Sequence, residues 1–347
     1  MTVAVAKVQT KSNVLTDLDL NRPLLEVEDL RVEFHTRDGV AKAVNGASFS
    51  VERGETLAIV GESGCGKSVT SQAIMGILET PPARIAEGRV LFHGIDLLKL
   101  PKDTRRRTRA NHVAMVFQDA LSALNPVWTV GYQLAELFRQ HRGMSKKDAM
   151  ARSLELLDLV KIPAAKQRIL EYPHQFSGGM RQRVMIAMAL ALDPDLLIAD
   201  EPTTALDVTV QAQIMRLLKD IQVERHMGLI LITHDLGVVA DVADKISVMY
   251  AGRIVEQAEV HEIFARPAHP YTKALLKSIP RLDTKGQRLE IIKGLPPALT
   301  NIPPGCAFAP RCTYAQDVCR SQVPPLSTVA ADRASACHFS SEVIQDV

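Results

Sequence analysis

The chain is poor in aromatic residues and has no long hydrophobic run. Aromatic side chains make up 4% of its 347 residues, and there is one tryptophan. The longest strongly apolar stretch, Val184 to Leu192, has nine residues, whereas a helix that spans a membrane needs about 20. The N-terminal segment also lacks the apolar core of a signal peptide. These absences predict a soluble, cytoplasmic, globular protein.

An excess of charge of either sign is missing as well. The formal net charge is +2, with 23% charged and 46% hydrophobic residues. This balance excludes a disordered chain and a globally basic nucleic-acid binder. One basic run, Lys102 to Arg109, departs from it. Because the run stands alone, we interpret it as the solvated face of a helix.

Proline and cysteine are scarce over most of the chain and concentrated near its end. Ten of the 19 prolines and four of the five cysteines follow residue 266. Proline removes a backbone donor and clashes inside a helix, so long helices are not expected throughout this part. We therefore divide the chain into a flexible leader (1–22), a main domain (23–265) and a C-terminal extension (266–347).

Short apolar segments alternate with helical stretches in the main domain. Four of them are predicted to be buried strands: Thr56–Val60, Val113–Phe117, Leu196–Ala199 and Leu229–Thr233. Strands that alternate with helices predict an α/β fold with a largely parallel sheet. In such sheets the ligand lies beyond the carboxyl ends of the strands, where glycine, polar or acidic residues follow each of these segments.

A phosphate-binding loop follows the first of these strands. It has the pattern G-x-x-x-x-G-K-S/T between a strand and a helix. Its residues are Gly61, Glu62, Ser63, Gly64, Cys65, Gly66, Lys67 and Ser68. We include the next residue, Val69, among those expected to bind the nucleotide. The glycines let backbone N–H groups converge on phosphate oxygens at the positive end of a helix dipole. Lys67 would reach the β- and γ-phosphates, and the Ser68 hydroxyl would ligate Mg²⁺. The loop predicts a nucleoside triphosphate site.

Cys65 lies inside this loop, among converging amides and close to Lys67. Such surroundings lower the pKa of a thiol and make it reactive. We therefore expect alkylation of Cys65 to inactivate the protein and bound nucleotide to protect it. The alternative is an inert small residue.

Two carboxylates follow the strand at Leu196–Ala199. Asp200 fits the acid that holds Mg²⁺ in nucleotide sites, usually through water. Glu201, the next residue, could polarise the attacking water as a general base. An apolar strand that ends in two acids is weak evidence alone, but the phosphate loop upstream favours the functional interpretation.

The segment Phe176–Arg183 resembles the signature sequence of ABC-type ATPases, whose usual form is Leu-Ser-Gly-Gly-Gln. Ser177, Gly178 and Gly179 offer a hydroxyl and bare amides at the start of a helix, which makes a second anion cradle. Met180 stands where the family usually has Gln.

Other elements resemble the same family and follow in its order. The resemblance implies that Gln118 is the Q-loop glutamine that senses Mg²⁺ and the permease, and that His234 is the switch histidine at the γ-phosphate. It implies a D-loop at Ala205-Leu206-Asp207, with Asp207 near nucleotide, and an adenine-stacking role for Phe34. The implied catalytic set is Glu201, His234, Gln118 and Lys67, and the implied Mg²⁺ set is Ser68, Gln118 and Asp200.

The resemblance narrows to the oligopeptide/dipeptide transporter branch. It rests on Thr36–Gly39, Tyr172–Gln175, His269–Thr272 and the segment Pro303–Cys312. The fold it implies is a P-loop NTPase with a RecA-like core and a helical signature subdomain at about residues 119–183. The activity it implies is ATP hydrolysis that powers uptake of oligopeptides or dipeptides.

One phosphate loop and one signature cannot close an ABC site alone. The resemblance implies that ATP is held between two ATPase subunits, with a heterodimer as first choice and a homodimer as second. It implies two transmembrane permease subunits, which the region from Gln118 to Arg142 would contact, and an extracytoplasmic peptide-binding protein. It also implies a peripheral location at the cytoplasmic face of the inner membrane. The alternative is an ABC-type ATPase that acts on nucleic acid or as a non-transport regulator. No sustained heptads of a coiled-coil insertion appear, and we expect no nucleic acid partner.

Cys306, Cys312, Cys319 and Cys337 lie within 32 residues. In a cytoplasmic protein such a set favours metal ligands over disulfides. The spacing differs from the paired cysteines of zinc ribbons and could suit an iron–sulfur cluster. The resemblance implies a 4Fe-4S cluster, with zinc and free thiols as the alternatives.

Overall fold

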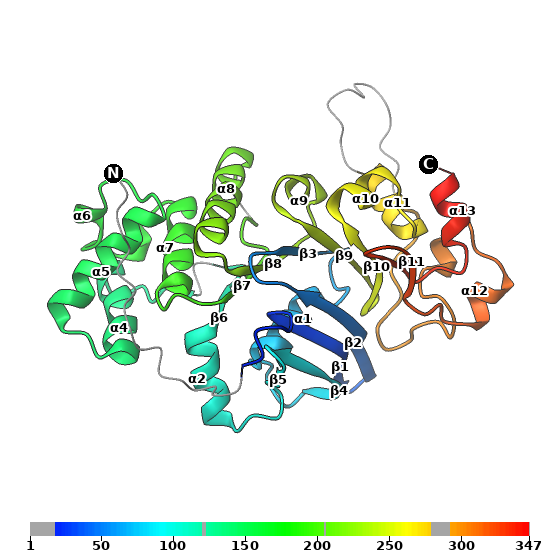
Figure 1. Cartoon of the computed structure of the whole chain (residues 1–347), viewed down its shortest axis with the longest axis horizontal. Coiled ribbons are helices and arrows are strands. Elements are labelled where there is room, and N and C mark those ends of the chain that lie inside the picture. The colour runs from blue at the N-terminus through cyan, green and yellow to red at the C-terminus, as the bar shows by residue number, and fades with distance from the viewer. Residues whose placement is uncertain (1–17, 120–122, 205, 279–291, 347) are drawn as a thin grey trace.

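The computed structural model describes residues 18–119, 123–204, 206–278 and 292–346. Within them the chain forms two β-sheets flanked by helices (Figure 1). The larger sheet has eight strands in the order β11-β12-β10-β9-β3-β8-β7-β6, and the smaller has four in the order β2-β1-β4-β5. Ala205 of the expected D-loop and residues 1–17 of the expected leader lie outside the described residues.

The strands of the larger sheet are β3 (Thr56–Val60), β6 (Val113–Val116), β7 (Leu196–Asp200), β8 (Gly228–Thr233), β9 (Lys245–Tyr250), β10 (Arg253–Glu259), β11 (Ser327–Ala330) and β12 (Arg333–Ser335). Those of the smaller sheet are β1 (Leu25–Thr36), β2 (Gly39–Val51), β4 (Ala83–Phe92) and β5 (Ile95–Asp96). The longer helices are α1 (Lys67–Met75), α2 (Lys102–His112), α4 (Val130–Arg142), α5 (Lys146–Leu159), α7 (Gly178–Leu190), α8 (Val208–Arg225) and α11 (Pro270–Lys277). The shorter ones are α6 (Ala165–Arg168), η1 (Pro173–Gln175), α9 (Leu236–Val242), α10 (Val260–Ala265), η2 (Ala309–Arg311), α12 (Asp317–Ser321) and α13 (Ser340–Gln345).

Parallel pairing joins five neighbouring strands, β9-β3-β8-β7-β6, of which β6 is the edge strand. Every residue of β3, β7 and β8 is buried. Parallel strands covered on both faces have near-continuous apolar sequences, which is why these segments could be identified without the structure. The expected α/β fold is confirmed, and the four expected strands agree with β3, β6, β7 and β8 to within one residue at each end.

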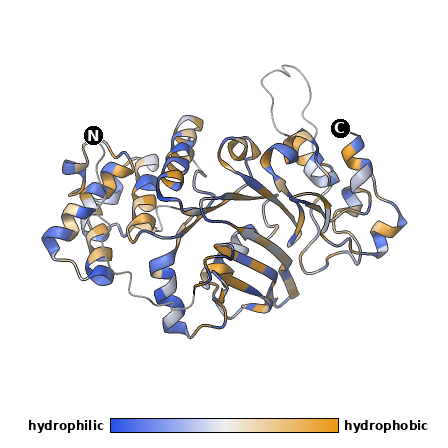
Figure 2. Cartoon of the chain, viewed as in Figure 1, coloured by the Kyte–Doolittle hydropathy of each residue, from blue (hydrophilic) through white to orange (hydrophobic). Residues whose placement is uncertain are grey.

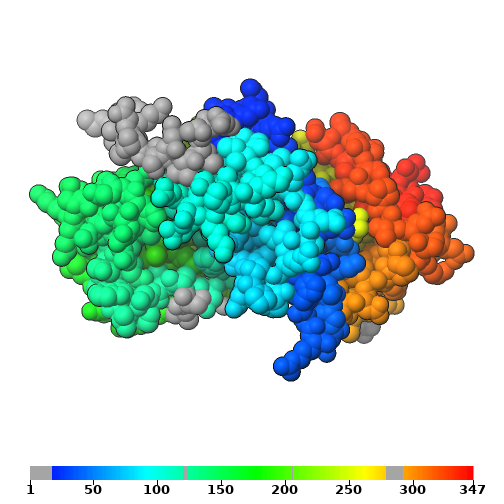
Figure 3. All heavy atoms as spheres, turned by 90° about the horizontal axis from the view of Figure 1, so that it is seen from below, coloured from blue at the N-terminus to red at the C-terminus, as the bar shows by residue number. Residues whose placement is uncertain are grey.

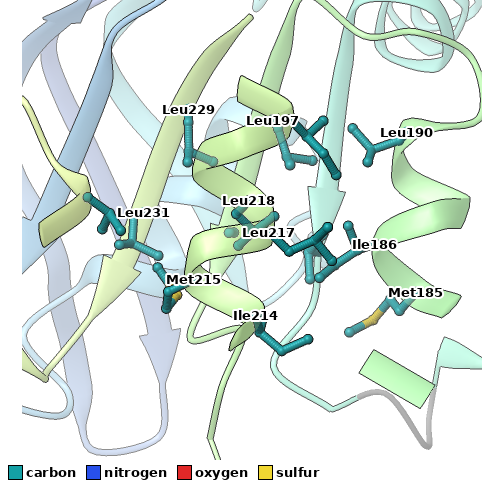
Figure 4. Close-up of a cluster of buried hydrophobic side chains, with 14 of the residues drawn as sticks. Met185, Ile186, Leu190, Leu197, Ile214, Met215, Leu217, Leu218, Leu229 and Leu231 are labelled. Atoms are coloured by element: carbon teal, nitrogen blue, oxygen red, sulfur yellow. The ribbon is translucent and has the colours of Figure 1, made fainter. Parts of the chain in front are cut away.

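Successive residues of the central strands point to opposite faces of the sheet. Leu197 and Leu229 pack against α7 and α8 (Figure 4), whereas Leu57 and Ile198 pack in the cluster shared with α1 and the smaller sheet. Helices α4 to α7 gather at one end of the molecule, and α12 and α13 lie at the other (Figure 1). Figure 2 shows the central strands as largely hydrophobic. Among the described helices, none is long and apolar enough to cross a membrane.

The basic run Lys102–Arg109 lies in α2, which Figure 2 shows in hydrophilic colours. Most of its side chains are exposed or half-buried, as expected for a solvated helical face. Arg109 differs, because its guanidinium donates to the backbone oxygens of Met75 and Gly76. This arginine therefore satisfies carbonyl groups at the end of α1.

The C-terminal extension continues the larger sheet. β12 pairs with β10, and β11 pairs with β12, both antiparallel. Phe308 is buried in the same cluster as the central strands, and the Leu299 carbonyl accepts a hydrogen bond from the Lys42 N–H of β2 at 3.0 Å. Figure 3 shows the extension, in orange and red, beside the blue N-terminal strands. The expected boundary at residue 265 stays a prediction, but the sheet runs across it.

A buried ion pair ties β12 to β10. Arg333 Nη2 lies 3.4 Å from Glu256 Oε1, and the two side chains are 4% and 0% exposed. Glu256 also accepts hydrogen bonds from the N–H groups of Ala268 at 2.6 Å and His269 at 2.9 Å. Burial raises the pKa of Glu256, and these partners oppose the shift. The carboxylate is thus held in the core by several donors.

Arg333→Met should lower the free energy of unfolding by about 3 kcal/mol, because it leaves a buried carboxylate without its cation. Urea unfolding followed by circular dichroism would measure the change. Arg320→Met is the matched control, since Arg320 pairs with Asp317 on the surface of the same extension, and it should leave the midpoint in place. A midpoint for Arg333→Met equal to that of the parent would show that the Arg333–Glu256 ion pair does not stabilise the fold.

Candidate functional site

The predicted catalytic residues lie at the carboxyl ends of four neighbouring parallel strands. β3 runs into the phosphate loop and β7 ends at Asp200, while Gln118 and His234 follow β6 and β8. These strands are adjacent in the order β3-β8-β7-β6. Their carboxyl ends therefore form one row, which is where α/β sheets bind ligands.

The phosphate loop turns directly into α1. Gly66 is the N-cap residue with φ of 110°, no side chain caps the helix, and its first turn holds no acidic residue. A Cβ atom at this position would collide with the carbonyl oxygen of Ala43, so only glycine fits here. The first N–H groups of α1 meet no side-chain acceptor at the cap, a geometry that suits a phosphate group.

Lys67 lies over the loop with a buried side chain. Its Nζ donates to the carbonyl oxygens of Gly61 at 2.8 Å and Glu62 at 3.1 Å. These two bonds hold the ammonium group beside the amides that open α1. A phosphate bound there would meet both the helix terminus and a fixed positive charge.

Asp200 and Ser68 form the pair expected to hold a metal ion. The Ser68 hydroxyl donates to Asp200 Oδ1 at 3.0 Å, and Asp200 is 5% exposed. Burial raises the pKa of Asp200, and the bond from Ser68 opposes the rise. A desolvated carboxylate beside a hydroxyl is an oxygen donor set that suits Mg²⁺, whose charge would offset the desolvation.

Three neighbours hold the Glu201 carboxylate. Oε2 accepts hydrogen bonds from the Gln118 amide and the Thr204 hydroxyl, both at 3.0 Å, and Oε1 lies 3.3 Å from His234 Nδ1. The backbone of Glu201 has φ of 45°, a left-handed conformation that costs energy in a non-glycine residue. The structure thus brings Gln118, Glu201 and His234 together. The sequence analysis did not identify Thr204 as a site residue, because a threonine three residues after an acidic residue matches no functional pattern.

Two residues of the extension also contact the phosphate loop. The Tyr271 hydroxyl accepts the N–H of Glu62 at 2.9 Å, and Arg311 forms two bonds to the Glu62 carboxylate at 2.7 and 2.9 Å. Both residues lie in segments that carry the resemblance to peptide transporters, but the sequence assigned them no role. They are 209 and 249 positions from Glu62, so no spacing could have indicated the contact.

Cys65 is buried, and the expectation of a lowered pKa is wrong in direction. Burial raises the pKa of this thiol, although Lys67 opposes the rise. Its Sγ lies 3.9 Å from Lys67 Nζ, yet desolvation of the thiolate outweighs the attraction. At neutral pH the thiol stays protonated and is a poor nucleophile.

The predicted signature begins α7. Ser177 is the N-cap residue, and its hydroxyl accepts the N–H of Met180 at 3.4 Å. Gly178 lies against Leu206, and a Cβ at Gly179 would meet Val210 Cγ1 at 2.6 Å. Among the described residues, no hydrogen bond or ion pair joins this segment to the phosphate loop, and Figure 1 shows α7 apart from α1. The two expected anion cradles are separate within one chain.

The remaining expected nucleotide contacts have structural partners of their own. Asp207 is the N-cap residue of α8 and accepts the N–H of Val210 at 3.0 Å. Phe34 and Val69 are half-buried and pack against the core cluster beneath the smaller sheet, whereas His35 is exposed. Their contacts with nucleotide stay predictions.

The four cysteines of the extension line one small cavity of about 10 Å³, roughly room for one water molecule. Burial raises the pKa of Cys306, that of Cys312 to about 11 and that of Cys337 to about 12. Within the described ranges, no group of three or more His, Cys, Asp or Glu side chains is arranged to hold a metal ion. The donor set, completed by Cys319, has the chemistry of a metal site, but the space does not fit the expected cluster.

Two family models match the chain. One, described as ABC transporter, matches residues 44–204. The other, described as oligopeptide/dipeptide transporter, C-terminal region, matches residues 255–319. Together they cover the phosphate loop, the acidic end of β7 and the first three cysteines of the extension.

Curated relatives match over most of the chain. The dipeptide transport ATP-binding protein DppD of Bacillus subtilis is 54% identical over 309 residues, 89% of this chain and 92% of the relative. The oligopeptide transport ATP-binding protein OppD of Salmonella typhimurium is 52% identical over 314 residues, 90% of this chain and 93% of the relative. OppD of Bacillus subtilis is 53% identical over 308 residues, 88% of this chain and 86% of the relative.

Solved structures agree with the fold. A dimeric structure of the ATP-binding cassette MJ0796 bound to ADP and Pi has a TM-score of 0.61 and 27% identity, and covers 68% of this chain and 98% of that chain. CbiO1 of Clostridium perfringens, part of an ABC transporter complex, has a TM-score of 0.60 and 31% identity. The match covers 70% of this chain and 91% of the CbiO1 chain. The strand order, the phosphate loop and these matches together show that the chain belongs to the ABC transporter family of ATP-binding proteins, in the branch that carries the oligopeptide/dipeptide transporter C-terminal region.

Proposed function

We propose that this chain is the ATP-hydrolysing subunit of a membrane importer that takes up oligopeptides or dipeptides. The observation that carries the proposal is the identity of 54% and 52% with dipeptide and oligopeptide transport ATP-binding proteins over about nine tenths of the chain. That similarity includes both the nucleotide site and the extension. An ATPase that acts on nucleic acid, or a non-transport regulator, is not favoured, because these relatives are named for peptide transport.

The phosphate loop would bind the ATP phosphates through the N–H groups that open α1 and through Lys67. Ser68, Asp200 and Gln118 would hold Mg²⁺, which neutralises charge on the β- and γ-phosphates when bound. Phe34 would stack on the adenine ring. The geometry supports this assignment, since the buried Asp200 carboxylate accepts the Ser68 hydroxyl at 3.0 Å and two oxygen ligands are thus side by side.

Glu201 would take the proton of the water that attacks the γ-phosphate. Gln118 and Thr204 hold one carboxylate oxygen, and His234 faces the other. His234 has a side chain that is 58% exposed, so it can reach a γ-phosphate in front of Glu201. These contacts orient the base before the reaction.

A second ATPase subunit would complete the site. The Ser177–Met180 cradle and Asp207 would face the nucleotide bound to the phosphate loop of the partner subunit. The distance between the Ser177–Met180 cradle and this chain's own phosphate loop supports that arrangement. The solved relative MJ0796 is dimeric. We propose a heterodimer of two similar ATPase chains, with a homodimer as the alternative.

An exposed aromatic surface supports the expected contact with permeases. Trp128 and Tyr132 stack with ring centroids 4.4 Å apart and are 47% and 37% exposed. Phe117 and Tyr172 are exposed as well, and such side chains are enriched in protein interfaces. We propose that the region from Gln118 to Arg142 meets two transmembrane permease subunits. The chain would then lie at the cytoplasmic face of the inner membrane as a peripheral subunit, with an extracytoplasmic peptide-binding protein delivering the peptide.

For Cys306, Cys312, Cys319 and Cys337 we propose a 4Fe-4S cluster, with zinc as the alternative. The shared cavity supports a metal at these cysteines. None of the four belongs to the nucleotide motifs, so the metal would be structural or regulatory. Four cysteine thiolates would hold such a cluster, and the walls of the small cavity would have to move apart to admit it.

Glu201→Gln should keep ATP binding and slow hydrolysis by about 10²–10⁴-fold, because the amide cannot accept the proton of the attacking water. Steady-state phosphate release and equilibrium nucleotide titration would separate the two effects. Lys67→Ala is the contrasting variant and should weaken binding itself. Hydrolysis by Glu201→Gln at the parent rate would refute the role given to Glu201.

Purification of the native complex from membranes should recover permease subunits, a second ATPase and peptide-stimulated ATP hydrolysis. Proteoliposomes carrying this complex should take up labelled peptide only with ATP, because hydrolysis is the proposed energy source. The Lys67→Ala complex provides the control without nucleotide binding. Recovery of nucleic acid in place of permeases would refute the proposal.

Anaerobically purified protein should be brown and contain iron. It should absorb broadly at about 400 nm, as is typical of clusters held by thiolates. Replacing Cys312 and Cys319 by Ser should remove the iron and expose the extension to protease, while the main domain still binds ATP. Colourless protein with one zinc would favour the alternative metal. Colourless, metal-free protein with four titrating thiols would refute both.

A further inference from the structure

The phosphate loop is anchored at its second residue by the C-terminal extension. Arg311 Nη1 and Nη2 donate to the two carboxylate oxygens of Glu62 at 2.7 and 2.9 Å. The two side chains are 4% and 26% exposed. An arginine–carboxylate pair with two parallel hydrogen bonds fixes the orientation of the two side chains as well as their distance. The guanidinium of this pair is almost fully shielded from water.

Every N–H of the Arg311 guanidinium has an acceptor. Besides Glu62, it donates to the Tyr250 hydroxyl at 3.2 Å and to the backbone oxygens of Lys293 and Ile292 at 3.1 and 3.4 Å. The guanidinium carbon also lies 5.8 Å from the ring centroids of Tyr250 and Phe308. The guanidinium is therefore held by partners other than Glu62 as well, as a positioning residue must be.

Tyr271 holds the backbone of the same loop residue. Its hydroxyl accepts the Glu62 N–H at 2.9 Å, and its own N–H donates to His269 Nδ1 at 3.1 Å. Burial lowers the pKa of His269 to about 3, so the imidazole stays neutral and keeps accepting this bond near neutral pH. The backbone and the side chain of Glu62 are thus both held from outside the phosphate loop.

The position of Arg311 depends on the cysteine segment. Arg311 ends η2 and immediately precedes Cys312. The Cys306 N–H donates to the Cys319 carbonyl at 2.7 Å, and the Cys312 N–H donates to Ala309 at 3.3 Å. The packed turn that holds the cysteines around their cavity therefore also aims the guanidinium at the loop.

We propose that Arg311 is a positioning residue for nucleotide binding, and that the extension sets the conformation of the phosphate loop through Glu62. The proposal rests on the proposed nucleotide role of that loop. Without Arg311, the loop would occupy its binding conformation for a smaller fraction of the time, and the apparent dissociation constant rises in proportion to that loss. Bound phosphate restores the conformation, so turnover at saturating ATP changes far less.

Arg311→Gln and Glu62→Gln test the proposal, with ATP binding measured on the full chain and turnover on its complex with the partner subunits. Each should raise the dissociation constant and the KM for ATP by about tenfold while kcat changes by less than about threefold. The double variant should bind no more weakly than either single variant, because both remove one interaction. Arg311→Lys keeps the charge but not the two-bond geometry, and should recover only part of the affinity.

Two reference variants separate the possible outcomes. Arg320→Gln, an exposed arginine in the same extension, should bind ATP as the parent does. Lys67→Ala tests the site itself: if it binds ATP normally, the proposed nucleotide site is refuted. If Lys67→Ala loses binding while folded Arg311→Gln and Glu62→Gln bind within twofold of the parent, Arg311 only anchors the extension and the positioning role is overturned. Should Arg311→Gln fail to fold, Glu62→Gln alone decides.

Discussion

In the larger sheet, β3 pairs with β8, β8 with β7 and β7 with β6 through parallel ladders. Both faces of β3, β7 and β8 are buried, so the register of these strands is set by core packing as well as by hydrogen bonds. Parallel pairing places every carboxyl end at one edge. Gln118, the Asp200–Glu201 pair, His234 and the phosphate loop meet there for that reason, although they come from distant parts of the sequence. We propose that hydrolysis of ATP depends on this row.

The C-terminal extension is joined to the ATPase core by several different interactions. It adds β11 and β12 to the sheet, buries Phe308 in the main core and places Arg311 and Tyr271 on the phosphate loop. Phe308, Arg311, β11 and β12 all lie in the segment between Cys306 and Cys337, whereas Tyr271 lies in α11. The extension is therefore part of the support of the phosphate loop.

Burial outweighs nearby charge at several thiols and acids of the molecule. Lys67 lies close to Cys65, yet desolvation raises the pKa of that thiol. Desolvation likewise raises the pKa of Asp200 and Glu256 despite their hydrogen bonds. Charge neighbours can be inferred from adjacent sequence positions, but burial requires the packed structure. This difference explains why the expected reactivity of Cys65 had the wrong sign.

Local sequence determined the four buried strands, the phosphate loop and the helix that begins after Ser177, because apolar runs and glycine positions act within a few residues. It also identified Asp200 and Glu201 through their place at a strand end, and Gln118 and His234 through the resemblance to ABC-type ATPases. Only the tertiary structure decided that Thr204 joins Glu201, that Arg311 and Tyr271 hold Glu62, and that the four cysteines line one narrow cavity. These contacts depend on how separate segments pack, and the free energy of packing has no signature in the spacing of residues along the chain.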